Sequence, residues 1–323
     1  MAVAALGARA LFNPVRRFIQ RFVDRRLYGF RFDLNELKKA EQPLEIKNPG
    51  ALTGRTLQEY QVLGVLGTGG MGEVYQGFGN GQTVAIKTML PGIAADKDMR
   101  TRFEREAKAG IELDHPHIAK VFAHGETDDT PYLIMDFIEG QDLSNLLKIE
   151  GRLNEAASIR IMGEICDALE AAHQKGFIHR DLKPSNIMIR PNGEAVLMDF
   201  GLTKMADTSA SLTGTGAIGT IDYMAPEQIT SAAEVDHRAD IYALGVTLYE
   251  MLTNEKPFKG GPAQVMFAHL QQPAPNPCDV NEAIPWSMAR AIMQAMEKNP
   301  DARFQSVREF AQALIQRNPI SFV

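Results

Sequence analysis

The stretch from residue 60 to residue 88 constrains the fold most. Three short segments, 60–66, 73–78 and 83–88, have the composition and alternation of half-buried strands, and the turn at 79–81 joins the last two as a hairpin. A glycine-rich run, 67–72, connects the first two. The sequence therefore predicts an antiparallel sheet with a glycine-rich bend between its first two strands.

Helical patterns dominate after Ile138, for example over 155–175 and 287–297. We therefore predict an α+β fold of two lobes, a small β-rich lobe followed by a larger helical one. The expected divisions are a basic amphipathic helical segment (1–40), a linker rich in Pro and Gly (41–56), the β-rich lobe (57–138), the helical lobe (139–318) and a short tail (319–323).

Charge and cysteine content limit the class of protein. Residues 1–50 carry ten Lys/Arg and five Asp/Glu, whereas the net charge of the whole chain is −6, so the rest is strongly acidic. An acidic body argues against general nucleic-acid binding. Cys166 and Cys278 are too few for a disulfide framework and have no metal-binding spacing, which favours a reducing, cytoplasmic compartment.

The N-terminal segment has a basic amphipathic pattern. Apolar residues such as Phe18 and Phe22 recur at helical spacing, and arginines occupy the opposite face. No run of 18 apolar residues is present to span a membrane. Three roles for residues 10–35 stay open: peripheral contact with an anionic membrane, docking on the body of the protein, and self-association.

The glycine run has the spacing G-x-G-x-x-G, which is ambiguous by itself. In a dinucleotide-binding fold the glycines open a helix, but here the strand-like segment 73–78 follows at once. A plain turn is one interpretation. The other is a flap whose backbone N–H groups approach phosphates closely because the glycines have no Cβ atoms.

Lys87, in Val84-Ala85-Ile86-Lys87, is a candidate phosphate ligand. Strand alternation places it on the same face as the small Ala85, although a lone lysine in a strand is usually just solvated. A following helix, predicted over 97–113, offers Glu104 and Glu106 as partners. Glu106 lies nearer the apolar face of that helix, so we expect Glu106 to orient Lys87.

Two later loops gather charge at predicted strand ends. His179-Arg180-Asp181-Leu182-Lys183-Pro184-Ser185-Asn186 follows a predicted helix, and Asp199-Phe200-Gly201 follows the apolar segment 195–198. Asn186 and Asp199 offer oxygens of the kind that Mg²⁺ takes from proteins. An isolated Asp-Phe-Gly would be read as a turn.

The order of these motifs, completed by Ala225-Pro226-Glu227, resembles the eukaryotic-type (Hanks-type) protein kinases over residues 60–315, and most closely their bacterial serine/threonine members. The resemblance implies the two-lobed protein kinase fold and transfer of the γ-phosphate of ATP to protein Ser/Thr hydroxyls, with Mg²⁺, or alternatively Mn²⁺, as the cofactor ion. Protein substrates are the implied partners.

The resemblance also implies roles for single residues. Asp181 accepts or orients the hydroxyl proton, Lys183 neutralises the γ-phosphate, Asn186 and Asp199 hold the metal, and Lys87, oriented by Glu106, binds the α/β-phosphates. The nucleotide site it implies comprises Leu66, Gly67, Thr68, Gly69, Gly70, Met71, Gly72, Val74, Ala85, Lys87, Met135, Asp136, Ile138 and Met188. Met135 is the expected gatekeeper, and the backbone at Asp136 and Ile138 is expected to bond adenine.

Further expectations concern support and regulation. Asp240 should brace the His-Arg-Asp backbone and Glu227 should pair with Arg303, while Gly110 stands where many relatives carry a bulky apolar residue and suggests a looser active arrangement. The segment between Gly201 and Ala225 is rich in hydroxyls. We expect activating phosphorylation there, with Arg180 as the phosphate partner, and list the candidate regulatory residues: Arg180, Thr213, Thr215 and, as a hydroxyl bonded to the catalytic residues, Thr220.

Two other functions are alternatives to an active protein kinase. A pseudokinase scaffold would use the same fold without turnover, although Lys87, Asp181, Asn186 and Asp199 are all present. A small-molecule phosphotransferase would share part of the motif set, but Gly219-Thr220 and Ala225-Pro226-Glu227 resemble the part of protein kinases that docks peptides. An assay of ATP turnover with Mg²⁺ separates the first alternative from an active kinase.

Overall fold

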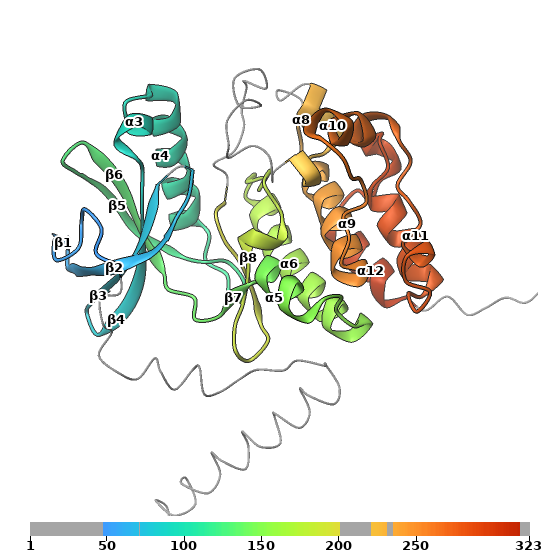
Figure 1. Cartoon of the computed structure of the whole chain (residues 1–323), viewed down its shortest axis with the longest axis horizontal. Coiled ribbons are helices and arrows are strands. Elements are labelled where there is room, and N and C mark those ends of the chain that lie inside the picture. Colours follow the sequence, from blue (N-terminus) through green and yellow to red (C-terminus); the bar gives the residue numbers. More distant parts are fainter. Residues whose placement is uncertain (1–47, 71, 201–220, 231–234, 317–323) are drawn as a thin grey trace, which may run out of the picture.

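A computed structural model describes residues 48–70, 72–200, 221–230 and 235–316 of the 323-residue chain. Figure 1 shows a sheet with two helices on one side of the molecule and a larger group of helices on the other. The two predicted lobes are therefore present, and the α+β two-lobed fold is confirmed.

The small lobe is built on a six-stranded antiparallel sheet in the order β1-β2-β3-β4-β6-β5. Its strands are β1 (Thr56–Leu57), β2 (Tyr60–Thr68), β3 (Glu73–Gly79), β4 (Gln82–Thr88), β5 (Val121–Thr127) and β6 (Thr130–Asp136). The helices α3 (Pro91–Ala94) and α4 (Lys97–Glu112) lie between β4 and β5 in the chain. The three strands and the helix predicted from the sequence are all found.

The large lobe is helical. Its helices are α5 (Leu143–Glu150), α6 (Glu155–Gln174), α8 (Pro226–Thr230), α9 (Arg238–Thr253), α10 (Pro262–Gln271), α11 (Trp286–Ala295) and α12 (Val307–Ile315), with short 3-10 turns η3 (Pro184–Asn186), η4 (Ile221–Tyr223), η6 (Pro277–Asp279) and η7 (Pro300–Ala302). Helix α9 is apolar on all sides, and nearly all its side chains are buried because other helices surround it.

A small antiparallel sheet joins the lobes. It consists of β7 (Gln141–Asp142), β8 (Ile187–Ile189) and β9 (Ala195–Leu197). The Leu197 N–H donates to the His117 carbonyl at 2.8 Å, and the Ala119 N–H donates to the Leu197 carbonyl at 2.9 Å. The chain just before β5 of the small lobe is therefore hydrogen-bonded to β9 of the large lobe.

Helix α4 packs directly on β5 at Gly110. A Cβ atom added to Gly110 would lie 2.2 Å from Val121 Cγ2, far inside van der Waals contact. Ala107, one turn earlier, is also small and fully buried in the same apolar cluster. Close approach of α4 to β5 therefore fills the space beside Gly110, and the looser active arrangement expected from its missing side chain stays a prediction.

This packing predicts opposite effects for one substitution at two helical glycines. Gly110→Ala should lower the free energy of unfolding by ~1–3 kcal/mol, because the new methyl group overpacks the contact with Val121. The control Gly163→Ala in α6, where nothing lies within 4 Å of the added Cβ, should be neutral or stabilise by up to ~1 kcal/mol. Urea unfolding monitored by circular dichroism measures both.

The pair Gly110→Ala/Val121→Ala provides the complementary test. Val121→Ala removes the Cγ2 atom that the new methyl group would meet, so the double variant should be destabilised by less than the sum of the single effects. Strict additivity of the two would contradict the direct contact between α4 and β5.

Candidate active site

The centre of the site is the side chain of Lys87 on β4. Its Nζ lies 2.8 Å from Asp199 Oδ1 and 3.2 Å from Glu106 Oε1 on α4. Residues 112 positions apart in the chain thus meet at one ammonium group. The sequence predicts Glu106, and not Glu104, as the partner of Lys87, because Glu106 lies nearer the apolar face of the helix. The structure shows Glu106 in that role.

Burial makes these charges depend on one another. Burial alone would lower the pKa of Lys87, but the carboxylates of Asp199 and Glu106 outweigh it and raise that pKa, so Lys87 stays charged. Burial also acts to raise the pKa of Asp199, and Lys87 overcomes it and holds that pKa below its ordinary value. For Glu106 burial wins over Lys87, and its pKa rises to about 8.

The glycine run forms the turn between β2 and β3. Gly69 N–H donates to the Gly72 carbonyl at 2.8 Å, and Thr68 pairs with Glu73 across the two strands. A Cβ on Gly72 would lie 1.6 Å from the Thr88 carbonyl oxygen, so the fold itself requires that glycine. A Cβ on Gly67 would meet nothing within 4 Å, which leaves room there for a ligand to approach the backbone.

The loop before β8 gathers the predicted catalytic groups. Lys183 Nζ lies 2.8 Å from Asp181 Oδ2, and Asn186 Nδ2 donates to the Asp181 carbonyl at 2.8 Å and to Asp181 Oδ2 at 3.2 Å. The Asp181 side chain is mostly buried, with 14% exposed. These contacts fix the direction in which the carboxylate of Asp181 points.

Asn186 and Asp199 fit the magnesium site that the sequence predicts. The hydrogen bonds of Asn186 use its amide nitrogen, which leaves the amide oxygen as a ligand. Asp199 is ionised beside Lys87, with 35% of its side chain exposed. One carboxylate and one amide oxygen suit Mg²⁺, which keeps several waters and binds phosphate oxygens with the rest of its positions.

Two residues next to this chemistry have unusual backbone conformations. Arg180 has φ 64° and Asp199 has φ 54°, in the left-handed region that residues other than glycine rarely adopt. Phe200 is buried, and the His179 ring meets it edge to face with centroids 5.0 Å apart. Such strain gathers at functional sites, but the sequence carried no signal for it.

Asp240 on α9 holds the backbone of the loop before β8, called the catalytic loop below because it carries Asp181. It is fully buried and accepts hydrogen bonds from the backbone N–H groups of His179 and Arg180 at 2.9 and 2.8 Å. Although burial favours the neutral acid, the hydrogen bond with His173 and the backbone donors hold the pKa of Asp240 below its ordinary value. The brace predicted from the sequence is present.

The residues predicted for the adenine site lie on both lobes. Val74, Ala85 and Met135 belong to one apolar cluster of the small lobe, and Ile138 and Met188 belong to a cluster at the junction of the lobes. Leu66 is 47% exposed on β2. The structure thus brings most of the predicted wall residues to the two sides of the junction between the lobes.

Two hydrogen bonds fix the backbone at Asp136, where the connection between the lobes begins. The Asp136 N–H donates to the Lys120 carbonyl at 2.9 Å, and the Asp136 side chain accepts from the Lys120 N–H at 3.1 Å. These bonds hold the chain at Asp136 without using its carbonyl. The arrangement is compatible with adenine binding to the backbone there.

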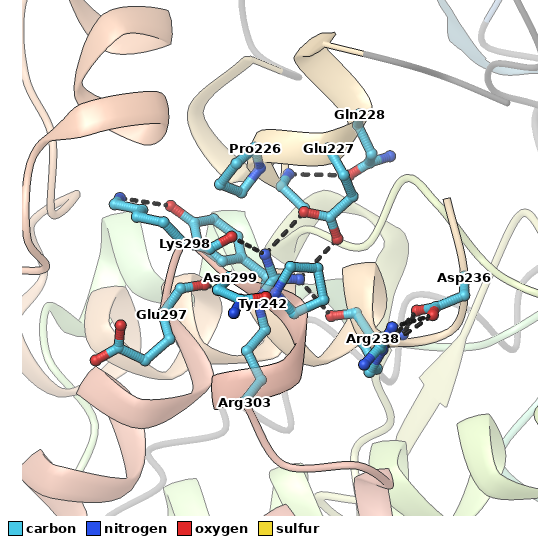
Figure 2. A network of polar contacts seen from close by, with 12 residues as sticks. Pro226, Glu227, Gln228, Asp236, Arg238, Tyr242, Glu297, Lys298, Asn299 and Arg303 are labelled. Carbon is cyan, nitrogen blue, oxygen red and sulfur yellow. Dashed lines mark hydrogen bonds and ion pairs between the residues drawn. The ribbon is translucent and has the colours of Figure 1, made fainter. Parts of the chain in front are cut away.

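Glu227 of α8 forms a buried ion pair with Arg303, as predicted (Figure 2). The guanidinium group binds both carboxylate oxygens, at 2.7 and 2.8 Å, and its side chain is fully buried. Gln228 is a residue that the sequence analysis missed. Its amide donates to the Arg180 carbonyl at 2.8 Å and accepts from the Ala225 N–H, so α8 is tied to the catalytic loop.

Some predicted residues fall outside the described part of the chain. They are Met71, Thr213, Thr215, Thr220 and the N-terminal segment 1–40. Within the described ranges no three acidic, histidine or cysteine side chains come together as a metal-binding group. No described helix has the length and apolar character to cross a membrane.

Comparison with known proteins gives a single family. The model of the protein kinase domain matches residues 60–321. Serine/threonine-protein kinase PknB of Mycobacterium leprae is 36% identical over 265 residues, which cover 80% of this chain and 42% of the relative. Serine/threonine-protein kinase PknE of Mycobacterium bovis is 38% identical over 263 residues, covering 80% and 46%. This chain thus spans less than half the length of these relatives.

A solved structure shows the same fold. The kinase domain of Mycobacterium tuberculosis PknI superposes with a TM-score of 0.67 at 30% sequence identity, over 82% of this chain and 98% of that one. The likeness therefore covers both lobes. Together with the family match, it confirms the resemblance to bacterial serine/threonine kinases, and the chain belongs to the protein kinase family.

Proposed function

We propose that this chain transfers the γ-phosphate of ATP to serine or threonine hydroxyls of proteins. The observation that carries the proposal is Lys87 bonded at once to Glu106 and Asp199, because this is the arrangement that a kinase needs for phosphoryl transfer. Lys183, two residues after Asp181, and the names of the relatives support Ser/Thr acceptors. A pseudokinase would not need all of these groups.

In this mechanism the protein positions charges and does no covalent chemistry. Lys87 binds the α- and β-phosphates, and the backbone at Gly67 and Gly69 covers them. Asn186 and Asp199 would hold Mg²⁺, which when bound would supply positive charge to the phosphates. Asp181 orients the acceptor hydroxyl and takes its proton, while Lys183, already 2.8 Å from Asp181, stabilises the charge on the transferred group.

The catalytic role of Asp181 is tested with Asp181→Asn. Turnover on an acceptor protein should fall by at least about a hundredfold, because the amide cannot accept the proton. The affinity for ATP should stay within a few-fold, since Asp181 is assigned to the hydroxyl and not to the nucleotide. Initial rates and titration with a fluorescent ATP analogue measure the two quantities.

Asp129→Asn is the matched control, because Asp129 is exposed in the turn between β5 and β6 and already has a left-handed backbone that Asn tolerates. It should keep normal turnover. If Asp181→Asn retained turnover close to the wild type, Asp181 would not be the catalytic base.

The variant Glu106→Gln separates the effect of Glu106 on the position of Lys87 from its effect on folding stability. The folded chain holds a proton on Glu106 up to about pH 8, whereas the unfolded chain releases it near 4.5, so this group makes the protein less stable as pH rises between those values. Gln does not ionise. The melting temperature of Glu106→Gln relative to the wild type should therefore increase from pH 5 to pH 8.

The same substitution should lower catalytic activity, although it raises the relative melting temperature. Above pH 8, where Glu106 is ionised, loss of the carboxylate whose Oε1 holds Lys87 at 3.2 Å should reduce kcat/KM about a hundredfold, in line with the cost of misplacing a reacting group. Glu104→Gln, on the exposed side of the same helix, is the control and should leave turnover unchanged. A melting-temperature difference that stayed constant with pH would contradict the buried, proton-holding state of Glu106.

We also propose that phosphorylation within Thr203 to Thr220 activates the enzyme, at Thr213 or Thr215. Support comes from the hydroxyl-rich sequence between Asp-Phe-Gly and Ala-Pro-Glu and from Arg180 beside Asp181. The double variant Thr213→Ala/Thr215→Ala should lose most autophosphorylation on this segment and at least about tenfold of its initial rate. Phosphopeptide mass spectrometry and rate assays test it, and full activity of phosphate-free enzyme would refute it.

For residues 10–35 we propose either peripheral contact with an anionic membrane or self-association, in a cytoplasmic protein. The support is the sequence alone, namely the arginine face opposite Phe18 and Phe22.

A further inference from the structure

Lys298 lies among two oxygen acceptors and an aromatic ring in the large lobe, an arrangement called the cage below; Figure 2 shows its contact with Tyr242. It follows α11 and precedes η7. Its Nζ lies 3.2 Å from the Ala268 carbonyl, 3.3 Å from Tyr242 Oη and 4.6 Å from the centroid of the Phe258 ring. Each contact favours an ammonium group: two acceptor oxygens and the face of an aromatic ring.

The charge of Lys298 is poorly compensated. No described carboxylate lies within ion-pair distance of it, and Arg303, which stacks on the same Tyr242 ring, is a second cation. Burial first, and Arg303 second, lower the pKa of Lys298 to about 8, against the opposing effect of the exposed Glu297. The charged form thus costs folding stability at neutral pH.

The cage connects to α10 through a fully buried pair. Tyr242 Oη is 2.8 Å from His269 Nδ1, and both residues have no exposed surface. Burial lowers the pKa of His269 to about 4, so this ring is neutral. The Tyr242 hydroxyl thus shares one hydrogen bond with His269 on α10 and accepts another from Lys298. Helix α10 in turn contacts η4, which begins at Ile221, four residues before the Ala225-Pro226-Glu227 motif that resembles the peptide-docking part of protein kinases.

The cage also connects to the catalytic loop. Arg303 donates to the Lys298 carbonyl at 3.1 Å and pairs with Glu227. Gln228, next to Glu227, donates to the Arg180 carbonyl at 2.8 Å, one residue before Asp181. Lys298 therefore lies where two sets of contacts meet, one leading to α10 and η4 and the other leading to the catalytic base.

We propose that Lys298 is a positioning residue for protein acceptors: its ammonium group ties the end of α10 to Tyr242 and so sets α10 and η4 relative to the catalytic loop. The inference rests on the proposed kinase function. A charge that is held at a cost to stability, without a carboxylate partner, is explained if the geometry it imposes is needed for activity. The groups that face it are Arg303, Glu297, Glu227 through Arg303, Tyr242 and neutral His269.

Lys298→Met in the full chain tests this, because it keeps the length of the side chain and removes the charge. With myelin basic protein as acceptor at pH 7, KM for the acceptor should rise about tenfold, because the contacts of Lys298 with Tyr242 and Ala268 no longer set the position of α10 and η4. KM for ATP should not change. The melting temperature should stay the same or rise, which a merely structural role of Lys298 would not produce.

Lys259→Met is the matched control, since Lys259 is exposed just before α10 and forms an ion pair with surface Glu255. It should keep the acceptor KM. The wild-type protein supplies a second test without mutation: its acceptor KM should rise from pH 7 to pH 9 as Lys298 loses its proton, while that of Lys298→Met stays flat over the same range.

Three results would overturn the proposal. They are an unchanged acceptor KM in Lys298→Met, a loss of activity that comes with a lower melting temperature, and the same pH dependence in variant and wild type. Phosphorylation of the acceptor by the wild-type protein tests the kinase function itself. The acceptor KM of Lys298→Met divided by that of the wild type tests the role of Lys298, so the two proposals can fail separately.

Discussion

The site depends on one ammonium group. Lys87 stands between Glu106 and Asp199, at 3.2 and 2.8 Å, and these three residues come from a strand, a helix and a loop of different lobes. Lys87 and Glu106 are largely buried, and the charge of Lys87 is kept by Asp199, whose own ionised form Lys87 favours in turn. The relative position of the lobes is therefore coupled to the electrostatics of the phosphate site.

The distance between α4 and the sheet matters because it sets where Glu106 lies. Gly110 lets α4 approach β5 until Val121 fills the space that a side chain would take. Glu106 is one helical turn from this contact. At Gly110 the close packing of α4 on β5 thus leaves no room for a side chain.

The large lobe supports the catalytic loop through buried polar groups. Asp240 holds the backbone of His179 and Arg180, while Arg303 holds Glu227 and, next to it, Gln228 reaches the Arg180 carbonyl. Such groups would be costly if any partner were missing, so they specify one arrangement of α8, α9 and the loop. Lys298 extends the same network toward α10.

The sequence by itself determined the fold class, the family and the identity of the groups that carry charge. Motif order, strand alternation and helical periodicity are local patterns, so β2 to β4, α4 and α6 were found close to their predicted bounds. The choice of Glu106 over Glu104 also followed from periodicity, because a helix buries only one face.

Only the tertiary structure decided the contacts that join distant segments. The left-handed backbone at Arg180 and Asp199, the fit of Gly110 against Val121 and the cage around Lys298 leave no pattern in neighbouring residues. Each arises where elements far apart in the chain pack together, and the free energy of a buried contact depends on what surrounds it. Local sequence does not contain that information.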